Sequence, residues 1–238
     1  MSKAKIHPIL FNTSMVRAIM DGRKTQTRRV VKSVFKGEGQ PTSTHTLIDI
    51  QKWEPLFEYQ EFWWNRNATG EHEYKAKPLY SVGDILWVRE SGRIINHNWD
   101  SFPTVEVLYL ADESKSKPIN VPPRFFNYPR WIKKQQGIPN GIFKEACRTW
   151  LKVTNVRAER IQAISWNDAI VEGIDRELDG TGWMYYGPER IEGNGDPRVA
   201  FKQIWDSIYT DDAVSFYANP WVWVYRYELC DRPEGWNA

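Results

Sequence analysis

Residues 14–31 read "SMVRAIMDGRKTQTRRVV" and change their periodicity in the middle. The first eight residues place four apolar side chains on one face of a helix, and Ser14 is suited to its N-cap. Gly22 is suited to the left-handed position that ends such a helix. The residues that follow alternate with period two, so Thr27 and Arg29 would share one strand face. The stretch therefore predicts a short helix, a glycine turn and a strand.

The turn and the start of the strand are rich in cations, namely Arg23, Lys24, Arg28 and Arg29. A basic edge strand of this kind would stay solvated and resist edge pairing. Four cations in seven residues would also grip phosphates. A lysine crowded by other cations can lose its proton and deprotonate a hydroxyl, here that of Thr27. The residues alone leave these three interpretations open.

Composition limits the class of protein. The chain has 238 residues, with 32 basic and 30 acidic side chains and a formal net charge of +2. This excludes a global basic field, so any nucleic-acid footprint must be local. Cys147 and Cys230 lack metal-ligand spacing, and no structural zinc site is expected. With no signal-peptide pattern and no membrane-length apolar window, we expect a soluble, cytoplasmic protein.

The rest of the chain predicts separated strands and short helices. Strands are expected within residues 81–95, 104–111, 150–156 and 219–229, and helices within 165–173 and 197–209. Two stretches without clear periodicity, 33–80 and 112–146, are interpreted as insertions in a single domain covering residues 1–238. Five or six strands bridged by loops, with two or three short helices, favour an α+β fold built on a small closed barrel.

The segment "GRKTQTRR", between a short helix and a strand, resembles the signature of the ASCH family, which belongs to the PUA-like barrel superfamily. That signature runs Gly-x-Lys-x-x-Glu-x-Arg. Gly22, Lys24, Thr27 and Arg29 occupy its positions, with threonine in place of glutamate. The bacterial ASCH enzymes that hydrolyse N4-acetylcytidine share this threonine. The resemblance implies that Lys24 and Thr27 belong to a catalytic set.

A later glutamate completes the catalytic set in those enzymes. The similar segment here is "ISWNDAIVEGI", residues 164–174, and it makes Glu172 the candidate. Glu172 would end a helix before Gly173, where the helix dipole disfavours a negative charge and favours a proton-donating carboxyl. The alternative is an exposed helix end without a role. Asp168 is expected to be the capping partner of Ser165.

The resemblance covers both ends of the chain and the strand near residue 85, and it extends there to the larger phage-encoded ASCH proteins. It is poor over 33–80 and 112–146. It implies a protein that binds a modified nucleoside or RNA base in a barrel cleft and hydrolyses an N-acyl amide such as N4-acetylcytidine.

In that mechanism Lys24 is the general base, Thr27 the nucleophile and Glu172 the proton donor, with no metal or organic cofactor required. The candidate substrate-binding residues are Gly22, Arg23, Arg29, Trp87 and Arg89. Arg29 would bind the carbonyl oxygen or a phosphate, unless it is a structural ion-pair partner. Trp87 would form the floor of the pocket, unless it is a core residue.

A non-catalytic nucleic-acid-binding module of phage origin is the alternative, with RNA expected more than DNA and no membrane as partner. Residues 124–134, "RFFNYPRWIKK", interleave basic and aromatic side chains as single-strand binders do. The same pattern fits a loop packed by its own aromatic rings. A nuclease ranks below both functions, because no histidine lies near the signature. Oligomeric state is left open.

Overall fold

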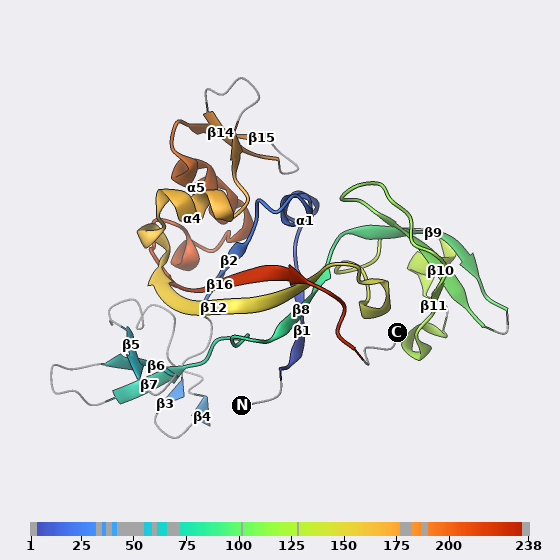
Figure 1. The fold of residues 1–238 in the computed structure, drawn as a ribbon, viewed down its shortest axis with the longest axis horizontal. Helices are drawn as coiled ribbons and strands as arrows, with labels where there is room; N and C mark the ends of the chain where they lie inside the picture. Colours follow the sequence, from blue (N-terminus) through green and yellow to red (C-terminus); the bar gives the residue numbers. More distant parts are fainter. Residues whose placement is uncertain are drawn as a thin grey trace. The chain divides into compact units, whose positions relative to one another are not determined.

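The computed structural model describes residues 4–31, 35–36, 40–41, 55–58, 61–65, 72–100, 102–127, 129–176, 182–186 and 190–234. Figure 1 shows the elements, which include sheets of five and of three strands and few helices. The expected α+β class is confirmed, whereas closure of the strands into a barrel stays a prediction. In the described ranges no helix has the length and apolar character needed to cross a bilayer.

The opening stretch folds as strand β1 (Ile6–Leu10), helix α1 (Thr13–Met20) and strand β2 (Gln26–Val30). The predicted cap is wrong, because Asn12 is the N-cap and its side chain accepts a hydrogen bond from the Met15 amide at 2.9 Å. Asn12 stands two residues before Ser14, and this cap starts the helix at Thr13. Gly22 has φ +75°, as the glycine turn requires.

The contacts divide the chain into two compact units, each assembled from separate segments. Unit 1 comprises Met1–Lys24, Gly83–Val153 and Tyr227–Ala238, and unit 2 comprises Thr25–Val82 and Thr154–Arg226. In unit 1, β8 lies between β1 and β12. In unit 2, β16 lies between β12 and β2. Strands β12 and β16 each have residues in both units.

Unit 1 combines parallel and antiparallel pairing. β1 runs parallel to β8 (Ile85–Arg89), and β8 runs antiparallel to the start of β12 (Trp150–Arg160). A separate antiparallel sheet has the order β9-β10-β11, formed by β9 (Gly92–Asn98), β10 (Thr104–Tyr109) and β11 (Ile119–Asn120). The expected strands within 81–95, 104–111 and 150–156 are thereby confirmed.

The stretch 112–146 is mostly irregular, as expected. Its regular elements are β11, the 3₁₀ helices η1 (Pro123–Phe125) and η2 (Lys144–Ala146), and helix α3 (Arg130–Lys133). Several of its apolar side chains belong to the same buried cluster as the sheet residues Ile94 and Val107, and these are Ile132, Ile138, Ile142 and Phe143. This segment therefore supplies part of the unit 1 core.

An ion-pair network around the buried Glu90 also lies in unit 1. The Arg148 guanidinium donates to both carboxylate oxygens of the fully buried Glu90 at 2.8 Å, and to Asp112 at 2.8 Å. The hydrogen bond from Arg148 holds the pKa of the Asp112 carboxyl well below its usual range. The guanidinium lies 4.0 Å from the centre of the Tyr109 ring, and burial raises the pKa of Tyr109 to about 12.

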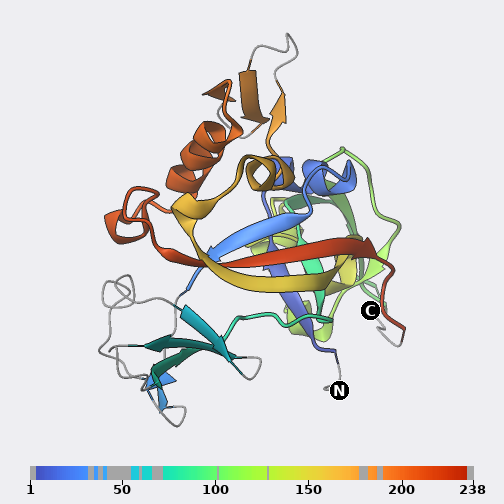
Figure 2. The same cartoon turned by 60° about the vertical axis from the view of Figure 1, so that its left-hand side comes forward.

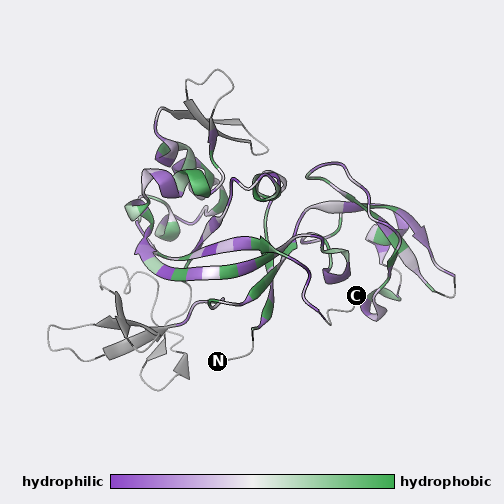
Figure 3. Cartoon of the chain, in the orientation of Figure 1, coloured by the Kyte–Doolittle hydropathy of each residue, from purple (hydrophilic) through white to green (hydrophobic). Residues whose placement is uncertain are grey.

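In unit 2, β2 pairs antiparallel with β16 (Trp221–Cys230), with Thr27 opposite Tyr225 and Arg29 opposite Trp223. The strands β12, β16 and β2 run side by side in Figures 1 and 2. Hydrophobic and hydrophilic residues alternate along β12 (Figure 3). The expected final strand is confirmed.

Helices α4 (Trp166–Val171) and α5 (Pro197–Ile208) pack together in unit 2, and the short helices η3 (Ile161–Ala163) and η4 (Asp212–Val214) flank them in sequence. Both α-helices were expected from the sequence. The apolar face of α5 buries Ala200, Phe201, Ile204 and Trp205. The Trp205 indole donates to the Val214 carbonyl at 2.8 Å, which satisfies its buried N–H.

The remaining strands of unit 2 form two further sheets. One has the order β13-β14-β15, formed by β13 (Asp175–Arg176), β14 (Gly182–Tyr186) and β15 (Arg190–Asn194). The other has the order β4-β3-β7-β6-β5, formed by β3 (Phe35–Lys36), β4 (Gln40–Pro41), β5 (Pro55–Glu58), β6 (Glu61–Asn65) and β7 (His72–Ala76). Most of the expected insertion 33–80 otherwise lies outside the described residues.

Candidate functional site

The three residues proposed as catalytic are all buried. Lys24 is 2% exposed, Thr27 is 1% exposed and Glu172 is 6% exposed. Among the described side chains, eight polar or charged ones are buried, and five of them come from residues 24–28 or from the end of α4. Buried polar groups are costly unless they are paired, so these five buried side chains must have partners or a role. The interpretation of residues 24–28 as a solvated basic edge strand is wrong, because most of these side chains are buried.

Lys24 closes the N-terminal segment of unit 1. Its backbone amide donates to the Ala18 carbonyl at 2.9 Å, which ties the turn to α1. Its Nζ lies 5.6 Å from the centre of the Phe11 ring, a cation–π geometry. The neighbouring Arg23 pairs with Asp21 at 2.8 Å, and both side chains are partly exposed. Arg23 is therefore charge-compensated, so it does not supply the crowding that the lysine-base hypothesis assigned to it.

Thr27 and Arg29 are brought together on β2, as their spacing predicted. The Arg29 Nη1 donates to the Thr27 Oγ1 at 2.6 Å and to the Arg28 carbonyl at 2.8 Å. Opposite Thr27, the buried Tyr225 hydroxyl accepts from the Leu79 amide at 3.0 Å, and burial raises the pKa of this phenol. Thr27 thus has its hydroxyl oxygen fixed by a half-buried guanidinium.

Arg28 carries the central ion pair of unit 2, which the sequence did not reveal. Its side chain is 1% exposed, and Nη1 donates to the Glu172 carboxylate at 2.8 Å. Nε donates to Glu159 at 3.0 Å, and Asp168 lies 3.3 Å from Nη2. Burial works to lower the pKa of the Arg28 guanidinium, but Glu172 and Glu159 outweigh it, so that pKa is raised. The charge of Arg28 is therefore compensated by carboxylates of its own unit.

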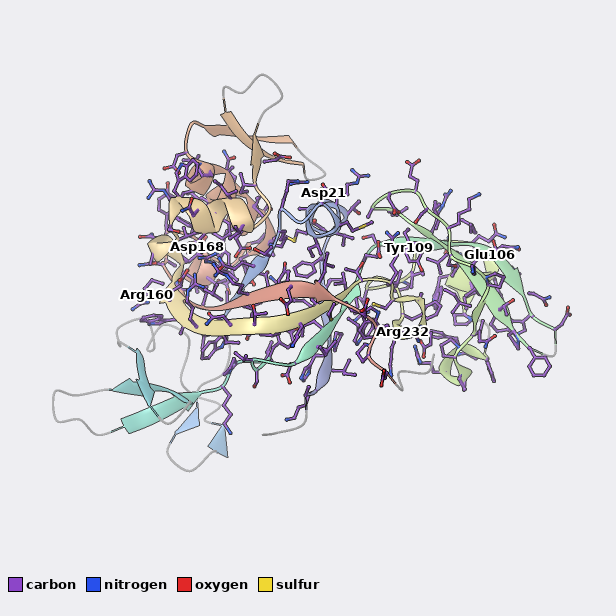
Figure 4. The ribbon with its side chains drawn as sticks, viewed as in Figure 1. Asp21, Glu106, Tyr109, Arg160, Asp168 and Arg232 are labelled. Atoms are coloured by element: carbon purple, nitrogen blue, oxygen red, sulfur yellow. The ribbon has the colours of Figure 1, made fainter. Side chains whose placement is uncertain are left out.

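A second layer surrounds this pair. Arg157 donates to Asp168 at 3.0 Å and to Glu159 at 2.9 Å, and Gln26 donates to Asp168 at 3.1 Å. Figure 4 labels Asp168 on α4. Burial acts to raise the pKa of the Asp168 carboxyl, but the Gln26 hydrogen bond and the two arginines outweigh it, so the pKa is lowered. Two guanidinium groups therefore face three carboxylates in the described contacts.

Glu172 lies where the sequence placed it. It is the C-cap of α4, and Gly173 follows with φ +101°. Ser165 is the N-cap and accepts from the Asp168 amide at 3.0 Å, as expected, while the Asp168 carboxylate also joins the arginine network. The expectation of an exposed helix end is wrong, because Glu172 is buried against Arg28.

The candidate residues of unit 2 therefore form two pairs, Thr27 with Arg29 and Glu172 with Arg28. Successive residues of a strand point to opposite faces, so these pairs lie on opposite faces of β2. The period-two pattern that grouped Thr27 with Arg29 also grouped Gln26 with Arg28. The face that carries Gln26 and Arg28 could have been recognised from the sequence as a second site, because an arginine buried there requires acidic partners.

Trp87 and Arg89 lie on β8 in unit 1. The Arg89 guanidinium is 5.9 Å from the centre of the Trp87 ring, so the two share a face as their spacing predicted. Both line a pocket of about 410 Å³, whose other walls come from the 112–146 segment. Trp87 is half-buried at the edge of the unit 1 core.

No group of three or more metal-ligating side chains gathers among the residues that the structure describes. Comparisons with known proteins add no identification, since no family model, no curated protein and no solved structure matches the chain.

The buried pair yields a stability prediction. Arg28→Met should lower the free energy of unfolding by about 3–5 kcal/mol, because Glu172 and Glu159 lose their buried cation. The matched control is Arg157→Met, the same change at a side chain that is 34% exposed, which should cost about 1 kcal/mol or less. Urea unfolding of both variants measures the difference. Equal losses would contradict the central role of Arg28.

Asp168 yields a pH prediction. Because its folded-state pKa is lowered, its stabilising contribution is complete above the unfolded value of about 3.9 and is lost as the pH falls through the folded value. The melting temperature of Asp168→Asn should therefore lie below that of the unmodified protein at pH 7 and approach it towards pH 3. A difference that stays constant over this range would show that the charge of Asp168 is not stabilising.

Proposed function

We propose that this chain is an ASCH-type, PUA-like protein that binds a modified nucleoside or RNA base and hydrolyses an N-acyl amide such as N4-acetylcytidine. The observation that supports it is the burial of all three residues that the resemblance assigns to catalysis, Lys24, Thr27 and Glu172. Polar residues are rarely held out of water without a structural or chemical role. Functional sites are where such groups cluster.

The nucleophile is the Thr27 hydroxyl. The hydrogen bond from Arg29 occupies one lone pair of Oγ1 and fixes its position, while the hydroxyl proton remains to be donated. Lys24 takes that proton as general base, and Oγ1 attacks the acyl carbon. The Arg29 guanidinium is also suited to stabilise the oxygen on which negative charge develops.

The tetrahedral adduct then collapses. The carbon–nitrogen bond breaks, the amine leaves with a proton, and the acyl group stays on Thr27 as an ester. Water hydrolyses the ester, which returns the threonine hydroxyl and releases the carboxylic acid. The resemblance assigns the proton donor to Glu172. Glu172 is paired with Arg28, on the β2 face opposite Thr27, which favours a structural role, so the two roles need separate readouts.

A non-catalytic nucleic-acid binder is the second candidate, and one observation favours it. The Lys24 ammonium lies against the Phe11 ring, and an aromatic face attracts the charged form of lysine. A charged Lys24 is a ligand for a phosphate or a carbonyl oxygen and does not act as a base. In this case Thr27 and Arg29 would hold the base by hydrogen bonds.

The deciding experiment is hydrolysis of N4-acetylcytidine, free and within RNA. Lys24→Ala and Thr27→Ala should each reduce turnover by about 10²–10⁴-fold, while Thr27→Ser keeps a hydroxyl and retains part of it. Thr25→Ala is the matched control and should stay close to the unmodified rate. Glu172→Gln is assayed for both turnover and unfolding, since a purely structural Glu172 would change only the latter.

Two outcomes would contradict the proposal at different points. One is no turnover of either substrate by the unmodified protein, which rejects the hydrolase and leaves the binder as the function. The other is turnover that persists in Thr27→Ala, which would exclude Thr27 as the nucleophile.

A further inference from the structure

The unit 1 pocket contains none of the three residues proposed as catalytic, although the resemblance counts its Trp87 and Arg89 among the substrate-binding residues. Its walls come from β8, η1, α3 and the loop that leads into η2, and they include Trp87, Arg89, Arg124, Phe125, Trp131 and Lys144. A volume of about 410 Å³ lies within the range of small-molecule sites, roughly 300–1,000 Å³.

The aromatic rings of the pocket are fixed by contacts with one another. Phe125 meets Trp131 edge-on, with ring centres 5.1 Å apart, and meets Phe143 edge-on at 5.7 Å. Trp87 and Trp131 are only half-buried, so each keeps part of its indole surface accessible. An edge-on contact covers a face of only one ring in each pair, so ring faces remain for a planar ligand. The pocket therefore offers preordered stacking surface.

The side chain of Arg89 has a hydrogen-bond donor without an acceptor. Its Nε is buried and has no hydrogen-bond partner in the described part of the chain. The guanidinium lies 5.9 Å from the centre of the Trp87 ring, which does not satisfy an N–H donor. A buried donor without an acceptor is costly, and because Arg89 lines the pocket, an anion bound there would compensate its charge.

The charged side chains that line the pocket are all cationic. Arg89, Arg124 and Lys144 are cationic, and no carboxylate occurs among the described residues that line the pocket. Arg124 is held by Glu145 through two hydrogen bonds of 2.9 and 2.6 Å and lies 4.8 Å from the centre of the Phe125 ring. This bidentate pairing orients Arg124, while the charge of Arg89 remains for a ligand.

Gly141 brings the loop close enough to complete the pocket. It has φ +81°, and a Cβ at this position would meet the Glu90 carbonyl oxygen at 3.0 Å and the Arg89 carbonyl oxygen at 3.2 Å. Only glycine combines this conformation with this approach. The wall therefore lies directly against the end of β8 that carries Arg89.

We propose that this pocket binds one nucleotide, with its base stacked on the indole surface of Trp87 and Trp131 and its phosphate on Arg89 and Lys144. An inorganic anion would leave the aromatic surface unused, and an uncharged ring would leave Arg89 unsatisfied. A nucleotide matches both features, as in other sites that combine stacking with a cationic track. The nucleotide is either free or part of a single strand, since the chemistry of recognition is the same.

The test measures binding to the full chain by titration calorimetry, with AMP, adenosine, inorganic phosphate and an eight-residue oligouridylate as probes. AMP or the oligonucleotide should bind, and AMP should bind more tightly than adenosine or phosphate. Comparable affinities for AMP and the oligonucleotide indicate a free nucleotide as ligand. Binding of the oligonucleotide at least tenfold tighter than AMP indicates a single strand.

Arg89→Met should weaken binding at least tenfold, whereas the matched control Arg130→Met, an exposed arginine of α3 outside the pocket, should change it less than twofold. Lys144→Met provides a second pocket variant if Arg89→Met does not fold. Thr27→Ala should bind as the unmodified protein does, which separates this site from the proposed hydrolase. The proposal fails if neither AMP nor the oligonucleotide binds, or if the folded pocket variants bind normally.

Discussion

The buried guanidinium of Arg28 is the group on which the structure of unit 2 depends. An arginine keeps its charge at any accessible pH, so it can be buried only where carboxylates meet it. Glu159 comes from the end of β12 and Glu172 from the end of α4, and both carboxylates accept hydrogen bonds from Arg28. This requirement fixes the register of β2, because a slip of one residue would turn Arg28 to the other face. It also fixes Thr27 and Arg29 on the face away from the acids.

Unit 1 also contains an arginine–carboxylate ion pair, formed by different residues. Arg148 pairs with the fully buried Glu90 through both oxygens and reaches Asp112 as well. Glu90 directly follows β8, so this pair fixes the strand end that carries Arg89. In each unit one buried member of an arginine–carboxylate pair, Arg28 or Glu90, therefore stands one residue away from an arginine proposed to meet a ligand. Buried pairs of this kind are weak sources of stability but strong constraints on geometry.

The sequence predicted the structure correctly where the relevant contacts join residues that are close together in the chain. Period two placed Thr27 with Arg29 and Trp87 with Arg89, and glycine propensity identified the turns at Gly22 and Gly173. The cap of α1 was misplaced because Asn12 and Ser14 are both good capping residues, and only the structure shows which one reaches the free amide. The acidic partners of Arg28 were invisible, because they lie 131 and 144 residues away in the chain. The core contribution of 112–146 was missed for the same reason, since irregular backbone carries no periodicity.

The most direct test of the central claim, that the Thr27 face of β2 binds an acylated nucleoside, is an NMR titration of the ¹⁵N-labelled protein with N4-acetylcytidine. The account predicts shifts that saturate at the backbone amides of Thr27 and Arg29 and at the Arg29 side chain. Shifts confined to residues around Trp87, or no shifts at all, would contradict it.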